Sequence, residues 1–187
     1  MINKFANGSI IWQLYNHCSS AFVQTYFKHA DASGHQASHC LTDFIVEFDS
    51  KHRLRLKNIF TENFICFNKR QRIAIRRDGL DEKCHFRERI TPSGYTQLQS
   101  AWRPYLFLGF NRRGRFQDPS QFKKKKRCFS FTKLVRHASS SSVLLNECSN
   151  PQKEAEENEK INLEAERQRL LYNAVRESLL GQIRVRP

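Results

Sequence analysis

The amino-acid sequence predicts an all-β protein of the β-trefoil class with a helical tail at its C-terminal end. Short runs rich in β-branched and aromatic residues alternate with turn residues over much of the 187-residue chain, a pattern typical of a sandwich or barrel. Similar segments recur at intervals of about 40 residues, which indicates repeated units. Three such units of about four strands each are expected to form a barrel capped by three hairpins.

Ten runs have the composition of strands, separated by turn residues. The predicted strands are residues 10–15, 21–27, 43–48, 53–59, 64–67, 72–76, 84–90, 95–99, 105–110 and 128–134. Their inward-facing apolar side chains are expected to form the core, and the candidates are Leu14, Phe44, Val46, Leu56, Ile65, Phe86, Leu98, Leu106, Leu108 and Phe131. The turns at Asp78-Gly79 and Arg113-Gly114 are expected on the outside, with glycine supplying a positive φ.

The internal repeat is carried by pairs of similar segments. Residues 67–72 (FNKRQR) resemble residues 110–115 (FNRRGR), which lie 43 residues later. Residues 56–60 (LKNIF) precede residues 98–102 (LQSAW) by 42 residues, with Leu, a small polar residue and an aromatic residue at alternate positions. Phe44 likewise precedes Phe86 by 42 residues. These matching offsets relate all three units to one another.

The chain is expected to divide into four segments. Residues 1–9 form an N-terminal extension, 10–138 the trefoil domain, 139–150 a linker and 151–187 a helical or partly disordered tail. Asn150 and Pro151 are typical of the start of a helix. Glutamates crowd the early part of the tail and arginines the later part, which suits the helix dipole, and Gly181 is a plausible stop.

The positive charge of the chain is concentrated near the end of the trefoil segment. The net charge is +14, yet the tail from Asn150 onward holds seven acids and seven bases and is neutral. Between residues 111 and 137, ten Lys or Arg residues accompany a single acid, Asp118. Like charges held close together repel, so this concentration predicts a polyanionic partner: nucleic acid, an acidic membrane or a sulfated polysaccharide.

Other classes of site have little support in the sequence. No apolar run is long enough to span a bilayer, and no secretory signal is visible. The tripeptide at Asn7 is a glycosylation sequon. The six cysteines include no C-x-x-C pair; His35, His39 and Cys40, with Cys18, could bind a metal, but we favour a polar loop and expect neither metal nor cofactor. No arrangement of catalytic residues is visible, so we expect no enzyme.

Several strands resemble those of the fibroblast growth factor family. Residues 12–16 (WQLYN) and 43–47 (DFIVE) resemble the first and third strands of the family. Residues 64–69 (FICFNK) and 84–88 (CHFRE) resemble its Y-I-C-M-N-K and C-x-F-x-E strands. Residues 105–115 resemble the strand and turn before its heparin-binding loop. The similarity covers residues 10–137.

The finer resemblance is to one subfamily. The pair Cys66 and Cys84, with the segment Gln13-Leu14-Tyr15, is similar to the subfamily of vertebrate factors eight, seventeen and eighteen, and most closely to its insect members. The resemblance implies a secreted growth factor that acts in development, differentiation and migration. Such a factor binds a fibroblast growth factor receptor tyrosine kinase, with heparan sulfate as co-ligand, and triggers receptor dimerisation and signalling.

The resemblance also implies residue roles. Tyr15, Tyr95 and Leu134 are expected to form an apolar patch against the second immunoglobulin domain of the receptor. Glu88 and Thr96 are expected to contact the linker to its third domain. Cys66 and Cys84 are expected to form a disulfide if the chain is secreted.

The heparan sulfate site is expected in the basic part of the third unit. Five residues match positions that line this site in the family, namely Asn111, Arg112, Arg113, Lys126 and Arg127. Charge alone adds Arg115, Lys123, Lys124 and Lys125. Arginine binds sulfate oxygens in bidentate fashion, whereas lysine acts as a point charge.

Two alternatives remain beside this interpretation. Residues 123–127 fit a short nuclear localisation signal, so the chain could be an intracellular or nuclear basic trefoil that binds nucleic acid or another polyanion. No helix-turn-helix or zinc finger is visible, and nucleic acid is therefore the less favoured partner. A sugar-binding trefoil of the ricin type would carry Q-x-W in each unit, and the sequence has none.

Overall fold

The computed structural model describes residues 9–36, 38–138, 163–164 and 166–172. The chain divides into two units, Met1–Pro151 and Gln152–Pro187. The described residues of the second unit are helical. The sequon at Asn7, the helix start at Asn150 and Pro151, and the stop at Gly181 lie outside the described residues.

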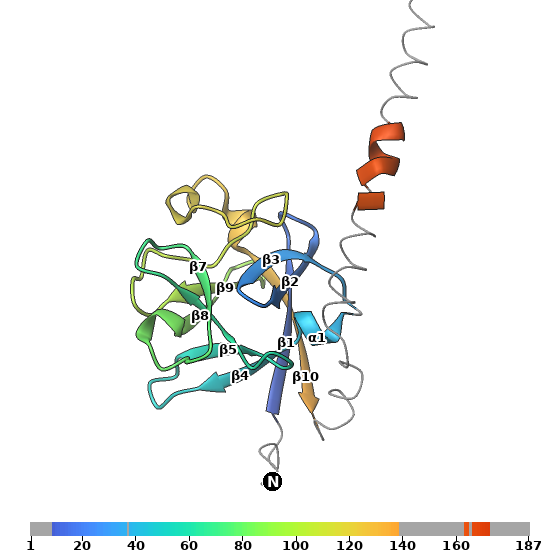
Figure 1. Ribbon diagram of the computed structural model, residues 1–187. Helices are drawn as coiled ribbons and strands as arrows, with labels where there is room; N and C mark the ends of the chain where they lie inside the picture. The colour runs from blue at the N-terminus through green and yellow to red at the C-terminus, as the bar shows by residue number, and fades with distance from the viewer. Residues whose placement is uncertain (1–8, 37, 139–162, 165, 173–187) are drawn as a thin grey trace, which may run out of the picture. The chain divides into compact units, whose positions relative to one another are not determined.

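The first unit contains a closed barrel, the β-trefoil that the sequence predicts (Figure 1). The barrel strands are β1 (Ser9–Asn16), β4 (Phe44–Phe48), β5 (Leu54–Asn58), β8 (Phe86–Ile90), β9 (Thr96–Ser100) and β10 (Phe131–Ala138). The ring closes because β1 pairs with both β10 and β4, β5 pairs with both β4 and β8, and β9 pairs with both β8 and β10.

Hairpins extend from the barrel in each unit. Strands β2 (Ala21–Tyr26) and β3 (His29–Gly34) form the first, and β6 (Phe64–Phe67) and β7 (Ile73–Arg76) form the second. In the third unit the prediction of a strand at residues 105–110 is wrong. This segment makes only the isolated bridges Gln99–Phe107 and Phe110–Phe116. Strand β3 was not predicted, because its sequence is largely polar and small.

Short helical turns occupy the remaining connections. They are α1 (His39–Thr42), η1 (Glu82–Cys84), η2 (Pro119–Gln121) and η3 (Lys126–Phe129). The strands predicted to begin at residues 84 and 128 therefore begin later, at Phe86 and Phe131, because a 3₁₀ turn precedes each of them. The basic run at residues 123–127 thus lies in a loop that ends in η3.

The predicted core is confirmed. All ten candidate core residues belong to one buried cluster, in which Leu14, Leu56 and Leu98 are fully buried. These three leucines lie 42 residues apart on β1, β5 and β9, so each unit supplies an equivalent side chain to the barrel interior.

A polar residue two positions after each leucine organises the loop that follows. The side-chain oxygen of Asn58 accepts hydrogen bonds from the backbone N–H groups of Phe60 and Thr61, and its Nδ2 donates to the carbonyl of Cys40. Asn16 makes the same pattern, with Nδ2 donating to the carbonyl of Cys128, 3.0 Å away. Both side chains are fully buried, so losing either would leave several buried backbone groups without partners.

The two predicted turn glycines have different roles. Gly114 has φ of +71°, as expected, and a Cβ there would lie 2.7 Å from the carbonyl oxygen of Ala32. Gly79 is buried and is not among the described residues with positive φ, so that expectation was wrong. The absence of a side chain at Gly79 instead leaves room for the ring of Phe64, which would lie 2.7 Å from a Cβ at this position.

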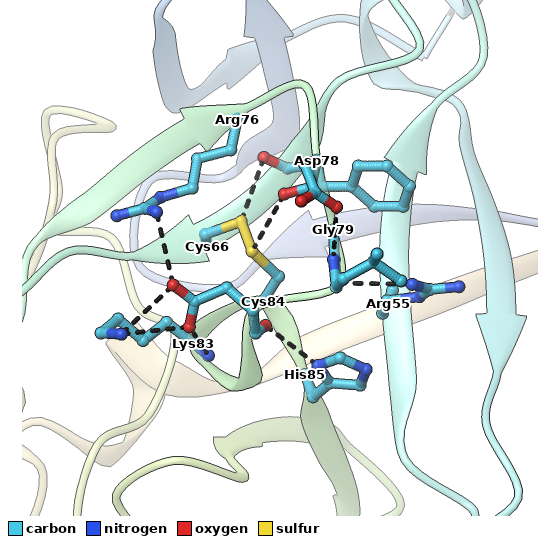
Figure 2. The surroundings of a disulfide bond; sticks show 11 residues. Arg55, Cys66, Arg76, Asp78, Gly79, Lys83, Cys84 and His85 are labelled. Carbon is cyan, nitrogen blue, oxygen red and sulfur yellow. Dashed lines mark hydrogen bonds and ion pairs between the residues drawn. A yellow bond between two sulfur atoms is a disulfide. The ribbon is translucent and has the colours of Figure 1, made fainter.

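Two disulfides cross-link the described residues of the first unit. Cys66 on β6 is bonded to Cys84 at the end of η1, beneath the Asp78-Gly79 turn (Figure 2). Cys18, in the turn between β1 and β2, is bonded to Cys128 in η3, 110 residues away. The second bond ties the basic loop to the first strand of the barrel.

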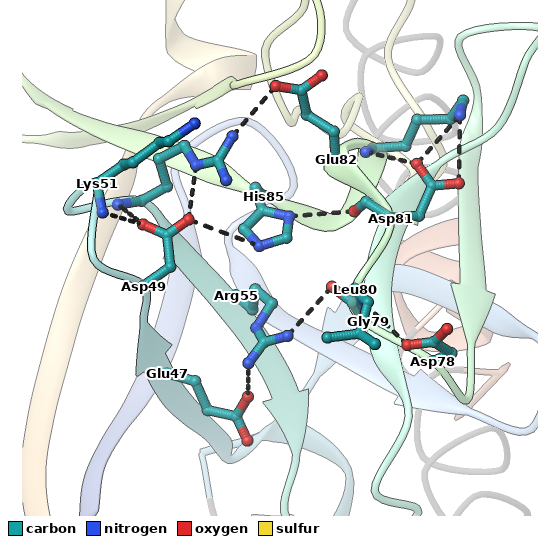
Figure 3. A network of polar contacts seen from close by, with 12 residues as sticks. Glu47, Asp49, Lys51, Arg55, Asp78, Gly79, Leu80, Asp81, Glu82 and His85 are labelled. Carbon is teal, nitrogen blue, oxygen red and sulfur yellow. Dashed lines mark hydrogen bonds and ion pairs between the residues drawn. The ribbon is translucent and has the colours of Figure 1, made fainter.

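A polar network surrounds the turn between β4 and β5 (Figure 3). Asp49 accepts hydrogen bonds from the backbone and side chain of Arg53 and forms an ion pair with it at 2.7 Å. Nε2 of the buried His85 lies 3.8 Å from the same carboxylate. Burial alone would raise the pKa of Asp49, but the hydrogen bonds from Arg53 and Lys51 outweigh it and lower the pKa to about 2.

Loss of the disulfide between Cys18 and Cys128 should destabilise the protein strongly. Replacing both residues by serine is expected to lower the free energy of unfolding by about 2–5 kcal/mol, because the bond closes a long loop. Guanidinium unfolding under non-reducing conditions measures the change. Equal unfolding midpoints for the wild type and the double variant would contradict a native bond between these residues.

Ionised Asp49 should contribute stability that disappears in acid. Its pKa is about 2 in the folded protein and about 3.9 in an unfolded chain, so the contribution is present above pH 4 and is lost as the pH falls towards 2. The difference in unfolding free energy between the wild type and Asp49→Asn should therefore widen as the pH rises from 2 to 4. Urea unfolding across this range measures it, and a constant difference would refute the assignment.

Candidate functional site

Basic residues from two separate segments meet in one groove. The groove has a volume of about 810 Å³ and lies between the β1–β2 turn, the 111–115 turn and the loop before η3. Six of the predicted polyanion-binding residues line it, namely Asn111, Arg112, Arg113, Lys124, Lys125 and Arg127. The other three, Arg115, Lys123 and Lys126, are exposed but are not among the residues that line it.

The 111–115 turn is shaped by its own backbone and by one asparagine. Asn111 N–H donates to the carbonyl of Arg115 at 2.7 Å, and its side-chain oxygen accepts from the N–H groups of Arg113 and Arg115. The carbonyl of Gly114 accepts a hydrogen bond from Ala32 on β3 at 2.8 Å. Asn111 was predicted to bind the polyanion, and in this structure its side-chain oxygen is used inside the turn, where it positions the arginines.

Apolar contacts hold the basic loop against the barrel. The ring of Phe122 stacks on Phe107 with centroids 4.1 Å apart and meets Phe129 edge-on. Arg127 Nε donates to the backbone carbonyl of His17 at 2.8 Å, and the disulfide of Cys128 fixes the loop a residue later. The loop therefore carries its lysines on a backbone that is anchored at both ends.

The cations of the groove are available for an anionic ligand. None of the predicted basic residues forms an ion pair with a carboxylate among the residues that the structure describes. Asp118, the acid in this segment, accepts from the N–H of Ser120 and caps η2, and that hydrogen bond lowers its pKa. Burial, and then the charge of Arg127, lower the pKa of His17.

One wall of the groove was not predicted from the sequence. His17, Cys18 and Ser20 line it from the β1–β2 turn, and Gln117 lines it from the third unit. The available signal was Cys128, which directly follows the basic run. Whichever cysteine bonds to it must lie beside the basic loop, but the sequence did not identify Cys18 as that partner.

The predicted receptor-binding aromatics lie in one row. Tyr15 packs edge-on against His17 with ring centroids 5.6 Å apart, and His17 lies 4.2 Å from Tyr95. Leu134 is paired opposite Gln13 on β1, one step along the same face from Tyr15. Tyr95 is 39% exposed, whereas Tyr15 and Leu134 are half-buried. The three residues can therefore present one apolar surface.

Glu88 and Thr96 lie together beside this row. The carboxylate of Glu88 forms an ion pair with Lys133 at 2.6 Å and accepts a hydrogen bond from Thr96 Oγ1 at 3.0 Å. The ammonium group of Lys133 also lies 4.3 Å from the centre of the Trp12 ring. Thr96 is 2% exposed, so in this structure it can orient Glu88 but offers little surface of its own.

The grouping of possible metal ligands is not assembled. Cys18 is bonded to Cys128, and Cys40 is also disulfide-bonded, so neither is a free thiol. Among the described residues, no three His, Cys, Asp or Glu side chains are placed to share a metal ion. The described helices include none with the length and apolar character needed to cross a membrane.

Comparisons with known proteins agree with the fold and the motifs. The family model for fibroblast growth factor matches residues 10–132. The chain is 30% identical to fibroblast growth factor 17 of Homo sapiens over 125 residues, which are 66% of this chain and 57% of the relative.

Two further relatives give the same picture. Identity is 28% to fibroblast growth factor 18 of Homo sapiens over 106 residues, covering 56% of this chain and 51% of the relative. It is also 28% to fibroblast growth factor 8 of Danio rerio over 125 residues, covering 66% and 60%. The chain thus spans less than two thirds of the length of these relatives. Its strands, its trefoil barrel and the match over most of that barrel show that the chain belongs to the fibroblast growth factor family, in the subfamily of factors 8, 17 and 18.

Proposed function

We propose that this protein is a secreted growth factor that binds a fibroblast growth factor receptor tyrosine kinase, with heparan sulfate as co-ligand. Binding brings two receptors together and starts signalling. The observation that carries the proposal is the convergence, in one groove, of arginines and lysines from two segments that form no ion pair with a described carboxylate, in a member of this family. Family membership also supports a signalling ligand and not an enzyme.

The groove suits a sulfated polysaccharide. Sulfates repeat along a flexible chain, so an open row of cations binds them better than an enclosed pocket. Arg112 and Arg113 are exposed on a rigid turn, where each guanidinium can bind a sulfate in bidentate fashion. Lys124 and Lys125 add point charges from the loop before η3. These features support heparan sulfate as the co-ligand.

The disulfides favour an extracellular location over a nuclear one. Cys66–Cys84 and Cys18–Cys128 are both bonded, and such bonds persist in oxidising compartments but are rare in the cytosol and nucleus. The basic run at residues 123–127 then serves a polyanion outside the cell and not nuclear import. Secretion is therefore part of the proposal.

The receptor-binding surface is the aromatic row with its neighbouring carboxylate. Exposed aromatic side chains on one face are typical anchors of protein interfaces. Tyr15, Tyr95 and Leu134 supply the apolar part, and Glu88 supplies an anion that can pair with a receptor arginine. Because His17 lines the groove and also contacts Tyr95, the two surfaces are neighbours, which suits a polysaccharide that touches ligand and receptor together.

Charge reversal in the groove should weaken heparin binding without unfolding the protein. The double variant Arg113→Glu/Lys125→Glu is expected to lose about tenfold or more in affinity at about 0.15 M salt, by analogy with the loss of phosphate contacts. The melting temperature should hold or rise, because repulsion between like charges is relieved. Heparin chromatography with thermal unfolding measures both.

The matched control carries the same change of net charge at the opposite end of the barrel. Ser50→Glu, Lys51→Glu and His52→Glu lie in the exposed turn between β4 and β5, far from the basic loop in Figure 1. Equal retention of the groove variant and the control would refute the assigned site. Competition between heparin oligosaccharide and duplex DNA at equal charge tests the partner, and preference for DNA would favour the nuclear alternative.

Removal of the Glu88 carboxylate should weaken receptor binding. Glu88→Ala is expected to reduce affinity for a receptor ectodomain by roughly tenfold or more, the range for a charged hydrogen bond. Surface plasmon resonance measures the change. The control is Lys133→Met, which breaks the same internal ion pair but keeps the carboxylate; it should bind the receptor at least as well as the wild type. If Glu88→Ala folds normally and binds unchanged, the proposed interface is wrong.

A further inference from the structure

A second turn repeats the geometry of the 111–115 turn in the groove. In residues 68–72, Asn68 N–H donates to the carbonyl of Arg72 at 2.8 Å, and Arg72 N–H donates to the side chain of Asn68 at 3.1 Å. Gln71 has φ of +62°, the counterpart of Gly114. The repeated sequence FNKRQR and FNRRGR therefore folds into the same five-residue turn in the second and third units. The proposed function so far uses only one of these turns.

The cations of the second turn have no described acidic partner. Lys69, Arg70 and Arg72 are all exposed, and none of them forms an ion pair with a carboxylate in the described ranges. A third turn of the same geometry, residues 49–53, behaves differently. There Asp49 replaces the asparagine and Arg53 pairs with both Asp49 and Glu82. Turn geometry alone therefore does not create an unpaired cationic surface.

The two basic turns are neighbours. The guanidinium of Arg72 lies over the ring of Phe116, 5.8 Å from its centre. Phe116 directly follows Arg115, the last residue of the 111–115 turn. Phe116 is held there by its bridge to Phe110. Arg115, which is exposed but does not line the groove, is thus the residue next to the ring that Arg72 covers.

A further cation is fixed beside the second turn. The hydroxyl of Tyr105 is hydrogen-bonded to Gln71 Nε2 at 3.2 Å and to Arg103 Nη1 at 2.7 Å. Tyr105 is 57% exposed, so packing in the core does not fix its position. These bonds hold Arg103 next to the positive-φ residue of the turn and enlarge the cationic surface.

We propose that residues 68–72, with Arg103, form a second contact region for the same sulfated polysaccharide chain that occupies the groove. One chain would run from Lys125 and Arg113 past Arg115 and Arg72 to Lys69 and Arg70. The inference rests on the proposed function, because it extends the same ligand. It assigns Lys69, Arg70 and Arg72 to the binding surface and makes chain length the determinant of affinity.

The test compares a short and a long heparin oligosaccharide by titration calorimetry. The variant Lys69→Glu/Arg70→Glu leaves Arg72 on Phe116 and the turn asparagine in place. It should lose about tenfold in affinity for a dodecasaccharide, since two contacts are removed. Its affinity for a tetrasaccharide, which fills only the groove, should stay within about twofold of the wild type. The Ser50/Lys51/His52 triple variant, with the same change of net charge, serves as the control.

The outcomes separate this inference from the proposed function. If Arg113→Glu/Lys125→Glu binds both oligosaccharides normally, the proposed function fails. If that variant loses binding while Lys69→Glu/Arg70→Glu matches the control on the dodecasaccharide, only the second contact region is refuted. Equal losses on the two oligosaccharides, or equal affinity of the wild type for both, would also overturn it.

Discussion

The pairing of β1 with β10 is the constraint on which both candidate surfaces depend. These strands are antiparallel along their full lengths, from Ser9 opposite Ala138 to Asn16 opposite Phe131. This register closes the barrel and brings the β1–β2 turn next to the basic loop of the third unit. It also sets Tyr15 beside Leu134 on the outer face. The polyanion groove and the receptor patch are therefore two consequences of one strand pairing.

The basic loop is retained because its anchors outweigh the repulsion between its charges. Two unit charges about 4 Å apart in water repel by about 1 kcal/mol, and exposed side chains can move further apart. Phe129, at the end of this loop, is fully buried, and burial of such a ring contributes about 1.5–3 kcal/mol; the disulfide of Cys128 adds a similar amount. Asn16 also fixes the loop by donating to the carbonyl of Cys128. The fold can thus hold the cations close together, at little net cost, where a ligand can use them.

Much of the fold could be predicted from the sequence, because the repeat and the apolar pattern carry it. Leu56 with Asn58, and Leu98 with Ser100, already showed the 42-residue spacing, and Leu14 with Asn16 continues it one unit earlier. Strand β3 was missed because His29–Gly34 has no strand-like composition. It pairs with β2, and the N–H of Ala32 on β3 donates a hydrogen bond to the carbonyl of Gly114. Residues 105–110 were predicted as a strand because they are apolar. Apolar residues can also be buried without pairing in a sheet, and here Gly109 and Phe110 pack against Phe129 and Phe131.

The site was less predictable than the fold. The charge pattern identified the cations, and the structure brings six of the predicted residues together. The bond between Cys18 and Cys128 could not be chosen, because six cysteines allow fifteen pairings, so the wall formed by His17 was missed. The second basic turn was visible as a repeat, but only the contact of Arg72 with Phe116 relates it to the groove.

Lysine footprinting with and without heparin tests the central claim most directly. The protein is labelled briefly with an amine-reactive acetylating reagent, and the modified lysines are quantified by mass spectrometry. The account predicts that a long heparin chain protects Lys124 and Lys125 strongly and Lys69 as well, while Lys51 on the β4–β5 turn stays fully reactive. Equal protection of Lys51 and Lys125, or no protection of Lys124 and Lys125, would contradict a polyanion site built by closure of this barrel.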